Sequence, residues 1–433
     1  MATQSLATTP IAERAHKRIA HRLLPYLFVL YIIAYLDRVN LSYAALDMTG
    51  ALGFTPEVYG FGAGIFFFGY FLLEIPGAIL VERWSARAWI ARIMISWGII
   101  AIFTGFIRTP HQFYAIRFLL GASEAGFFPG IVVYLSHWFR YEDRAKAMAM
   151  FMAAQPISNI IGSPVSGLLL GMHWLGIAGW RWLFILEGVP AVLFGIITIF
   201  YLTDWPHQAK WLTEDEKQWI AAELQQEKQA RQTARSYGIW QALRHREVML
   251  MALALFFIAA TVYGFNFWMP TIIKKLSGHS NLFVTSVGAL PYCVGLIAII
   301  FVGWSSDRTG ERRLHAALCI MVASAGLLFS ALAQNIPLML IFMFCLAAAG
   351  MYGYLPAFWS LPSSFLTGTA AAASIGLINS VGNLGGFFGP YTVGYITRRF
   401  QSFFWGVLCL SASALVASIL LLSLRRPNKD AKT

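Results

Sequence analysis

We expect an all-α integral membrane protein in which about twelve transmembrane helices form two pseudo-symmetric six-helix bundles. Three observations predict this architecture. Hydrophobic residues make up 58% of the 433 residues and charged residues only 12%, whereas soluble proteins are about 45 to 50% apolar. Apolar runs of about 20 residues, long enough to cross the hydrocarbon core as helices, recur along the chain. A long polar stretch at 204–247 divides these runs into equal halves.

The expected spans follow one another with short polar loops between them. Each run has the length that a helix needs to cross a bilayer at about 1.5 Å per residue. The runs lie near 23–45, 58–81, 88–107, 112–138, 146–171, 181–203, 248–272, 284–305, 314–334, 337–359, 367–392 and 402–424. Gly126 and Pro129 lie within the fourth run and predict a bend there.

The polar segments divide the chain into five parts, and the two equal halves indicate an internal duplication. Within the central polar stretch, Thr213 and Glu216 have the spacing of a capping box, which predicts a short surface helix. The parts are a tail at 1–22, a six-helix bundle at 23–203, a cytoplasmic linker at 204–247, a second bundle at 248–424 and a tail at 425–433.

The basic residues, which give a formal net charge of +12, are distributed by topology. Most Lys and Arg lie in the tails and in the loops that follow even-numbered spans, and few lie in the opposite loops. The positive-inside rule therefore predicts a multi-pass protein of the cell (inner) membrane with both termini in the cytoplasm. Because the charges form no single patch, we expect no nucleic-acid partner.

Two loops in corresponding places carry similar charged motifs. Residues 303–313 read GWSSDRTGERR, and residues 78–87 read AILVERWSAR. The first of these strings resembles G-x-x-x-D-R-x-G-x-R-R, the hallmark of the major facilitator superfamily; the second departs from it, with Ala78 and Ser85 at glycine positions. The resemblance implies a cytoplasmic gate that latches neighbouring helix ends, whereas the same charges can equally serve only to set topology. The gate residues are Glu82, Arg83, Asp307, Arg308 and Arg312.

Further motifs narrow the resemblance. YLDRVNLSYAAL at 35–46, RFLLGASEAGFFPG at 117–130, GWRWLFILEGVP at 179–190 and PHQAKWLTEDEK at 206–217 are similar to the anion:cation symporter family within that superfamily. The likeness covers nearly the whole chain. It implies transport of an organic anion, since relatives carry tartrate, sugar acids or aromatic carboxylates.

Five charged residues lie deep within apolar runs of the first half: Asp37, Arg38, Glu74, Arg117 and Glu124. Charges at bilayer depth cost roughly 2.5 to 3.5 kcal/mol each and usually mark an ion or substrate path. Arg117 and Glu124 are seven residues apart and share a helix face that can line a cavity. Asp37 and Arg38 diverge by about 100° around their helix, so one can contact substrate while the other turns toward the fourth span.

We assign proton coupling to Asp37 and Glu124, because burial disfavours a charged carboxylate and a nearby arginine favours it. Alternatively, either acid is a permanently ionised partner of Arg117. A guanidinium meets a carboxylate with two parallel hydrogen bonds, and the resemblance implies that Arg38 binds the substrate carboxylate. We expect Arg117 in the same cavity. Glu74, near Pro76, is interpreted as structural, and Glu187 as a support of the outer loop.

The family motifs suggest four more substrate-binding residues: Tyr70, Gln155, Trp359 and Asn379. Each has a simpler alternative. A buried Tyr, Gln or Asn can merely satisfy hydrogen bonds between helices, and tryptophans are common near the ends of spans.

The function that these features favour is proton-coupled secondary active symport, importing a small organic anion such as tartrate or a sugar acid by alternating access. A drug/proton antiporter of the same fold that exports amphipathic compounds is the alternative. An enzyme is not expected, because the sequence contains no P-loop, no H-E-x-x-H and no nucleophile elbow. We expect no cofactor besides the coupling proton, no metal, and activity as a monomer in the lipid bilayer.

Overall fold

The computed structural model describes residues 10–232, 245–362 and 368–425, apart from a few side chains within the helices. Every regular element in these ranges is helical. The predicted tails at 1–22 and 425–433 therefore lie partly outside the described residues. Residues 10–22 are the first turns of the long helix α1, which spans Pro10–Leu52.

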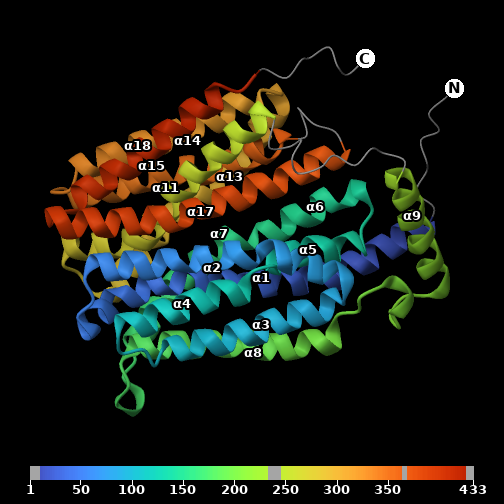
Figure 1. Ribbon diagram of the computed structural model, residues 1–433, viewed down its shortest axis with the longest axis horizontal. Coiled ribbons are helices and arrows are strands. Elements are labelled where there is room, and N and C mark those ends of the chain that lie inside the picture. The colour runs from blue at the N-terminus through green and yellow to red at the C-terminus, as the bar shows by residue number, and fades with distance from the viewer. Residues whose placement is uncertain (1–9, 233–244, 363–367, 426–433) are drawn as a thin grey trace.

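The helices pack in two groups that lie one above the other (Figure 1). The first group holds α1, α2 (Pro56–Arg83), α3 (Ala86–Thr104), α4 (Pro110–Glu124), α5 (Phe127–Ser136), α6 (Tyr141–Met152), α7 (Ala154–Leu170) and α8 (Gly179–Tyr201). The second holds α11 (Arg246–Ser277), α12 (Asn281–Gly288), α13 (Leu290–Thr309), α14 (Arg312–Leu332), α15 (Pro337–Trp359), α17 (Gly368–Phe400) and α18 (Phe403–Leu422). Short 3₁₀ helices span Trp174–Gly176 and Pro206–Gln208, and α9 (Glu214–Gln232) lies at one end of the first group.

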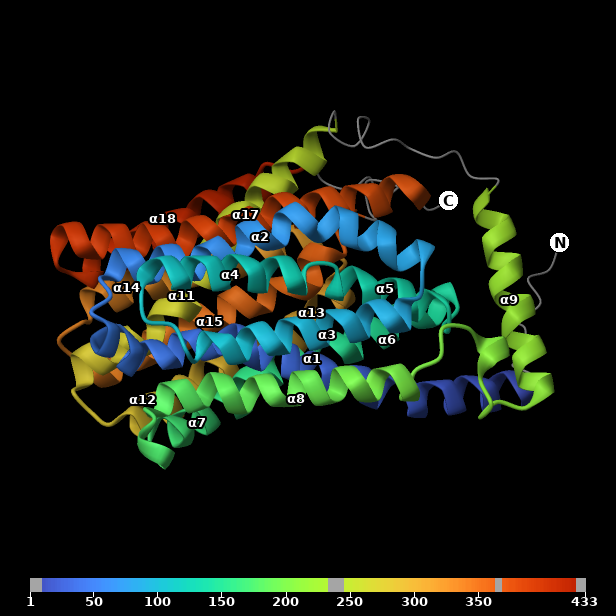
Figure 2. The same cartoon turned by 60° about the horizontal axis from the view of Figure 1, so that its bottom comes forward.

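The start of α1, the helix α9 and the end of α18 all lie at one end of the molecule, which we call the tail end; the opposite end is the far end (Figures 1 and 2). From the tail end, α1 runs to the far end and α2 returns. This alternation continues through both groups, because short loops join antiparallel neighbours.

Ten helical segments in the described ranges are long and apolar enough to cross a membrane. The expected spans at 146–171 and 367–392 are not among them. The first forms two shorter helices, α6 and α7, which are separated at Ala153. The second belongs to the 33-residue helix α17, in which Gly, Ser and Asn residues lower the hydropathy. The all-helical membrane fold is confirmed, while the count of twelve spans stays a prediction.

Several helices begin at side chains that satisfy the free N–H groups of the first turn. Thr109 and Gln112 form a complete capping box at the start of α4. Ser85, one of the departures from the motif glycines, accepts a hydrogen bond from the backbone of Ala88 and caps α3. The Ser85 hydroxyl also donates to Asp204 Oδ2 at 2.7 Å, which fixes the turn between α2 and α3 to the chain that follows α8.

Glycines allow neighbouring helices to approach closely where their backbones cross. A Cβ on Gly121 of α4 would lie 1.9 Å from the carbonyl oxygen of Phe66 in α2, and one on Gly389 of α17 would lie 2.0 Å from that of Ala260 in α11. Helices in a membrane gain little free energy by burying apolar side chains against one another, because the lipid tails are equally apolar. Close packing of this kind therefore contributes much of the free energy of helix association.

At the far end, polar contacts join the two groups. Asn281 of α12 donates to both carboxylate oxygens of Asp47 in α1, at 2.8 and 2.9 Å. Arg398 of α17 forms an ion pair with Glu57 of α2. The backbones also approach there, since a Cβ on Gly60 of α2 would lie 2.5 Å from the carbonyl oxygen of Pro390 in α17. The far end is therefore closed in this structure.

The predicted surface helix of the linker is α9, and ion pairs attach it to the tail end of the first group. Arg18 of α1 pairs with Glu216 at 2.8 Å, and Arg144 of α6 pairs with Glu227 at 2.9 Å. A hydrogen bond from the Thr213 side chain holds the pKa of Asp215 below its ordinary value. Residues 233–244 of the linker lie outside the described residues.

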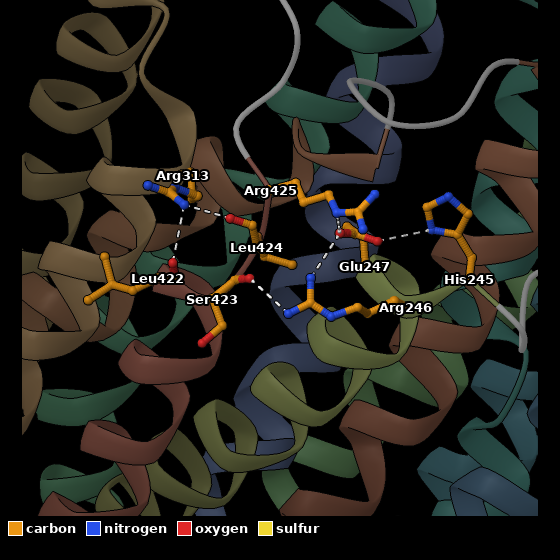
Figure 3. A network of polar contacts seen from close by, with 8 residues as sticks. All are labelled: His245, Arg246, Glu247, Arg313, Leu422, Ser423, Leu424 and Arg425. Carbon is orange, nitrogen blue, oxygen red and sulfur yellow. Dashed lines mark hydrogen bonds and ion pairs between the residues drawn. The ribbon is translucent and has the colours of Figure 1, made fainter.

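A second polar network fixes the tail end of the other group (Figure 3). Glu247, at the start of α11, lies within 3.5 Å of Arg246, 3.6 Å of Arg425 and 3.7 Å of His245. Arg313 donates to the backbone oxygens of Leu422 and Leu424. Because the last carbonyl groups of a helix lack intrahelical partners, this arginine, which belongs to the 303–313 motif, caps α18.

Candidate functional site

A cavity of about 480 Å³ lies between the two groups, with residues of both in its wall. Its lining includes most of the predicted substrate contacts, Arg38, Tyr70, Gln155, Trp359 and Asn379, together with the predicted proton carrier Glu124. Val133 of α5 and Trp359, at the last turn of α15, belong to the same wall. Since α5 and α15 both run toward the tail end, the cavity extends from the middle of the molecule in that direction.

Aromatic rings form much of the cavity wall. Tyr31 and Tyr35 come from α1, Phe66, Phe67 and Tyr70 from α2, and Tyr263, Tyr352, Tyr354 and Trp359 from the second group. The rings of Phe67 and Tyr263, whose centroids lie 4.3 Å apart, meet across the interface between the groups. An apolar wall of this kind lowers the local dielectric and strengthens each charge within it.

A break between α4 and α5 brings Glu124 to the cavity. Glu124 is the last residue of α4, and Gly126 follows with φ of +87° before α5 begins at Phe127. This left-handed backbone conformation favours glycine. A Cβ at Gly126 would also lie 3.2 Å from the Cα of Gly77 in α2. The bend that the sequence predicts at this position is therefore confirmed, and it ends α4 at the carboxylate.

In the cavity wall, Arg38 of α1 forms an ion pair with Glu124. The Glu124 carboxylate is 2% exposed. The guanidinium carbon of Arg38 lies 5.4 to 5.5 Å from the ring centroids of Tyr35, Phe66 and Tyr70, within the range of cation–π attraction. Since α1 and α4 are far apart in sequence, the ion pair is formed by the fold, and it presents a guanidinium fork to the cavity.

Asp37 points away from the cavity, as the divergence of neighbouring residues on a helix predicts. It is 3% exposed, and Trp97 Nε1 of α3 donates to its Oδ2 at 2.9 Å. Asp37 also interacts electrostatically with Arg117 of α4. The predicted turn of one member of the pair toward the fourth span therefore agrees with the structure.

Arg117 differs from the expectation that it lines the cavity. It is 1% exposed and does not belong to the lining, because the ring of Phe66 covers it at 4.8 Å. Its Nε and Nη2 have no hydrogen-bond partner within the described part of the chain. Arg117 and Asp37 thus form a buried charged layer behind the cavity wall, while Arg38 and Glu124 lie in the wall itself.

Glu74 of α2, interpreted from sequence as structural, lines the cavity and bridges the groups. It is 5% exposed and accepts hydrogen bonds from three residues of α17. Asn379 Nδ2 donates to Oε1 at 2.7 Å, Asn383 Nδ2 to Oε2 at 3.3 Å and Ser380 Oγ to Oε2 at 3.4 Å. Its position one helical turn after Tyr70, on the same face, was the signal that sequence reasoning missed.

Glu187 of α8 is a second acid that sequence reasoning placed elsewhere, at the outer loop. It is buried, it interacts electrostatically with Asp37, and Ser166 lies beside it. Neither of its carboxylate oxygens has a hydrogen-bond partner of normal geometry within the described residues. The deep acids therefore include Glu187 along with Asp37, Glu74 and Glu124.

The predicted gate charges lie at the tail end, away from the cavity lining. Asp307 and Arg312 form an exposed ion pair at 3.5 Å between α13 and α14, and the guanidinium carbon of Arg308 lies 5.5 Å from the ring centroid of Trp304. The side chains of Glu82 and Arg83 lie outside the described residues. Among the residues that are described, no group of three or more His, Cys, Asp or Glu is placed to hold a metal ion.

Membrane-length helices in two groups, with a charged cavity between them, define a multi-pass membrane transporter. The sequence shows to which family this transporter belongs. The profile of the Major Facilitator Superfamily matches residues 27–390, and the chain belongs to that superfamily. Its members are transporters and not enzymes, as the absence of catalytic motifs predicts.

Curated relatives span nearly the whole chain. A protein of Agrobacterium vitis named "Putative tartrate transporter" is 43% identical over 98% of this chain and 94% of its own length. A "Quinolone resistance transporter" of Acinetobacter baumannii is 38% identical over 93% of each chain. The family resemblance seen in the motifs is thereby confirmed.

Among solved structures, a bacterial homologue of the human lysosomal transporter Spinster, in an inward-facing and occupied conformation, superposes with a TM-score of 0.73 at 16% identity. The match covers 92% of this chain and 94% of that one. At 16% identity, this similarity shows a shared fold and nothing about the substrate.

Proposed function

We propose that the protein is a proton-coupled symporter that imports a small organic carboxylate by alternating access. The observation that carries this proposal is the ion pair between Arg38 and Glu124 in the wall of the cavity. A guanidinium in an apolar, partly desolvated site is the side chain best suited to hold a carboxylate. In this structure its partner is a carboxylate of the protein itself.

Substrate and Glu124 then compete for Arg38. An arriving carboxylate binds best when Glu124 is protonated, since the neutral acid releases the guanidinium and no longer repels the anion. Linkage is reciprocal, so a bound anion favours the protonated form of Glu124 to the same extent. The ion pair between Arg38 and Glu124 is therefore sufficient to couple anion binding to proton binding.

The balance of deep charges favours the same coupling. The described deep groups comprise the arginines Arg38 and Arg117 and the acids Asp37, Glu74, Glu124 and Glu187. An anion adds to a site that already carries more acids than bases, and protons offset the added charge. A second proton, for which Asp37 is our candidate, also allows a monoanion to use the membrane potential, worth about 2.3 kcal/mol per 100 mV.

We assign the tail end to the cytoplasm, because basic residues gather in the loops and tails there. With the far end closed, the conformation is then inward-facing, in the inner membrane, with both termini cytoplasmic. Asp307, Arg308 and Arg312, with Glu82 and Arg83, are proposed to latch the cytoplasmic end in the opposite state.

For the substrate we propose a hydroxylated carboxylate such as tartrate or a sugar acid. The name of the Agrobacterium vitis relative supports the first of these. The purified protein, screened against carboxylic acids by thermal shift, should be stabilised by its substrate, because a ligand of the folded state raises the melting temperature.

Arg38 provides the decisive test. In proteoliposomes with an inward proton gradient, Arg38→Ala should lose uptake and weaken binding of the screened acid at least about a hundredfold, since a buried charge-assisted pair is worth roughly 3 kcal/mol. Arg38→Lys keeps the charge but not the planar fork and should bind with intermediate affinity. Unchanged affinity in a folded Arg38→Ala protein would refute the site.

Drug/proton antiport is the second candidate, and the aromatic wall together with the Acinetobacter baumannii relative favours it. The two functions differ in the direction of flux. An inward proton gradient drives symport of substrate into proteoliposomes, whereas an antiporter expels preloaded substrate from them. Measuring both fluxes with the same compound and gradient separates the two.

A further inference from the structure

Of the two acids in the described cavity lining, Glu74 is the one whose side-chain hydrogen-bond donors all come from the opposite group of helices. It belongs to α2, and the three side chains that contact it lie within five residues of α17, from Asn379 to Asn383. Asn379 and Asn383 line the cavity with it. One short stretch of wall thus combines a carboxylate with two carboxamides.

The chemistry of this cluster fixes the orientation of both amides. An ionised carboxylate accepts hydrogen bonds and donates none, so each asparagine must turn its NH₂ group toward Glu74. The Nδ2 atoms are the bonded atoms, at 2.7 and 3.3 Å. Each asparagine can then offer its amide oxygen and its second N–H to a ligand. This wall therefore presents acceptors, two amide N–H groups and the negative charge of the ionised Glu74.

Arg38 lies in the same cavity and interacts electrostatically with Glu74, and the ring of Tyr70 interacts with both groups. An anion held at Arg38 therefore lies in the field of Glu74. A second carboxylate on the ligand that points toward α17 meets the like charge of Glu74, which the remaining amide N–H groups do not neutralise. A hydroxyl group at the same place can donate to Glu74 or to an amide oxygen.

We propose that Glu74 is a specificity-determining residue which, by orienting Asn379 and Asn383, selects monocarboxylates with hydroxyl groups over dicarboxylates. This inference rests on the proposed function, because it takes Arg38 as the site of the first carboxylate. It narrows the substrate class to sugar acids of the monocarboxylate type and disfavours doubly ionised tartrate.

Two pairs of acids test how a second carboxylate changes the affinity of the ligand. Threonate and tartrate share a four-carbon dihydroxy skeleton and differ in a terminal CH₂OH against a carboxylate, and gluconate and glucarate differ in the same way on six carbons. Affinities are measured on the purified full-length protein at neutral pH, by thermal shift and by competition. The wild-type protein should bind at least one monocarboxylate about tenfold or more tightly than its dicarboxylate partner.

Glu74→Gln removes the charge and supplies a donor, so this preference should fall to about twofold or less. Glu74→Asp retains the charge and should retain the preference even if both affinities weaken. Glu223→Gln, a change of the same type on α9 and far from the cavity, is the matched control and should leave the ratio unchanged. The ratio of the two affinities distinguishes a role in specificity from a structural role, because a loss of protein stability weakens the binding of both acids of a pair alike.

Equal binding of both members of each pair by the wild-type protein overturns the inference, as does a preference that persists in Glu74→Gln. If Glu74→Gln does not fold, Glu74→Ala, which also removes the charge, is measured in its place and should show the same loss of preference. Should all four acids fail to bind while another carboxylate is taken up in an Arg38-dependent way, the proposed function stands and this inference fails. If uptake of every carboxylate is independent of Arg38, the proposed function itself fails.

Discussion

Arg38 lies where its guanidinium can pair with Glu124 or with a substrate carboxylate, but not with both at once. In this structure it pairs with Glu124, and in the mechanism that we propose it binds the substrate carboxylate. The two acids near it differ in their surroundings, since Glu124 lies in the cavity wall and Asp37 is held behind it by Trp97. In the proposed mechanism Glu124 therefore competes directly with substrate for Arg38, whereas Asp37 acts through Arg117.

Glu124→Gln should uncouple transport from the proton gradient. Glutamine is always neutral, so the substrate no longer needs to displace a charged competitor from Arg38. We expect counterflow exchange to remain within about threefold of wild type while gradient-driven accumulation is lost, and substrate affinity to vary less with pH than in the wild type, because Asp37 can still bind a proton. Uptake of labelled substrate into proteoliposomes, with and without a gradient, measures both. Sustained uphill transport by this variant would contradict the role of Glu124, and Glu223→Gln serves as the neutral control.

At this scale the sequence identifies most of the site, because a charge in an apolar helix is conspicuous. Asp37, Arg38 and Glu124 were predicted on that ground. Glu74 was recognised as deep on the same ground but was interpreted as structural, since nothing in the sequence indicates that α17 lies opposite it with three hydrogen-bond donors. Arg117 shares a helix face with Glu124 but lies behind Phe66, and only the packing of α2 on α4 decides this.

Helices in the structure depart from the predicted spans where backbone geometry intervenes. The run at 112–138 forms α4 and α5 because Gly126 adopts a positive φ. The run at 146–171 is divided at Ala153, whose φ of −62° and ψ of −19° are still helical; Pro156, which has no N–H, removes a hydrogen bond that would join the two helices. Hydropathy detects an apolar run but not a break within it, so the existence of a span is predicted better than its continuity.

Gly60→Ala should open the far end without unfolding the protein. Its Cβ would lie 2.5 Å from the Pro390 oxygen of the opposite group, so α2 and α17 must separate there by a small distance. Gly121→Ala is the matched control, because its Cβ would lie 1.9 Å from Phe66 of the same group. Overpacking costs about 1 to 3 kcal/mol in each case, but only Gly60→Ala has an alternative conformation in which the clash is absent.

The measurement uses a cysteine at Asn281 in protein whose four native cysteines are replaced by serine. A membrane-impermeant maleimide should react with it at least about fivefold faster in Gly60→Ala than in the parent, the equivalent of roughly 1 kcal/mol. Gly121→Ala should lower the melting temperature and leave the labelling rate unchanged. Equal labelling in all three proteins would show that the α2–α17 contact does not hold the far end closed.

The molecule as a whole is two groups of helices with a cavity between them and a closed far end. Contacts at that end include small residues, one ion pair and one charge–amide contact, none of which needs a large apolar area to be broken. The rings of Tyr59 and Trp268, whose centroids lie 4.9 Å apart, also meet there, so separation must expose some aromatic surface as well. Separation at that end is the property that a molecule must have if its two groups rock about a central site.

Locking the far end should therefore stop transport while sparing the site. Asp47 and Asn281 contact each other across the groups at 2.8 Å, so cysteines at both positions can be joined by a short, reducible bifunctional thiol reagent. The linked protein should lose at least about 90% of its uptake, because the linked groups cannot separate at that end, yet bind substrate from the tail end with near-normal affinity. Reduction of the linker should restore uptake, and each single-cysteine variant treated with the reagent is the control. Normal uptake by fully linked protein would mean that the substrate crosses without separation of the two groups at the far end, which is incompatible with alternating access between them.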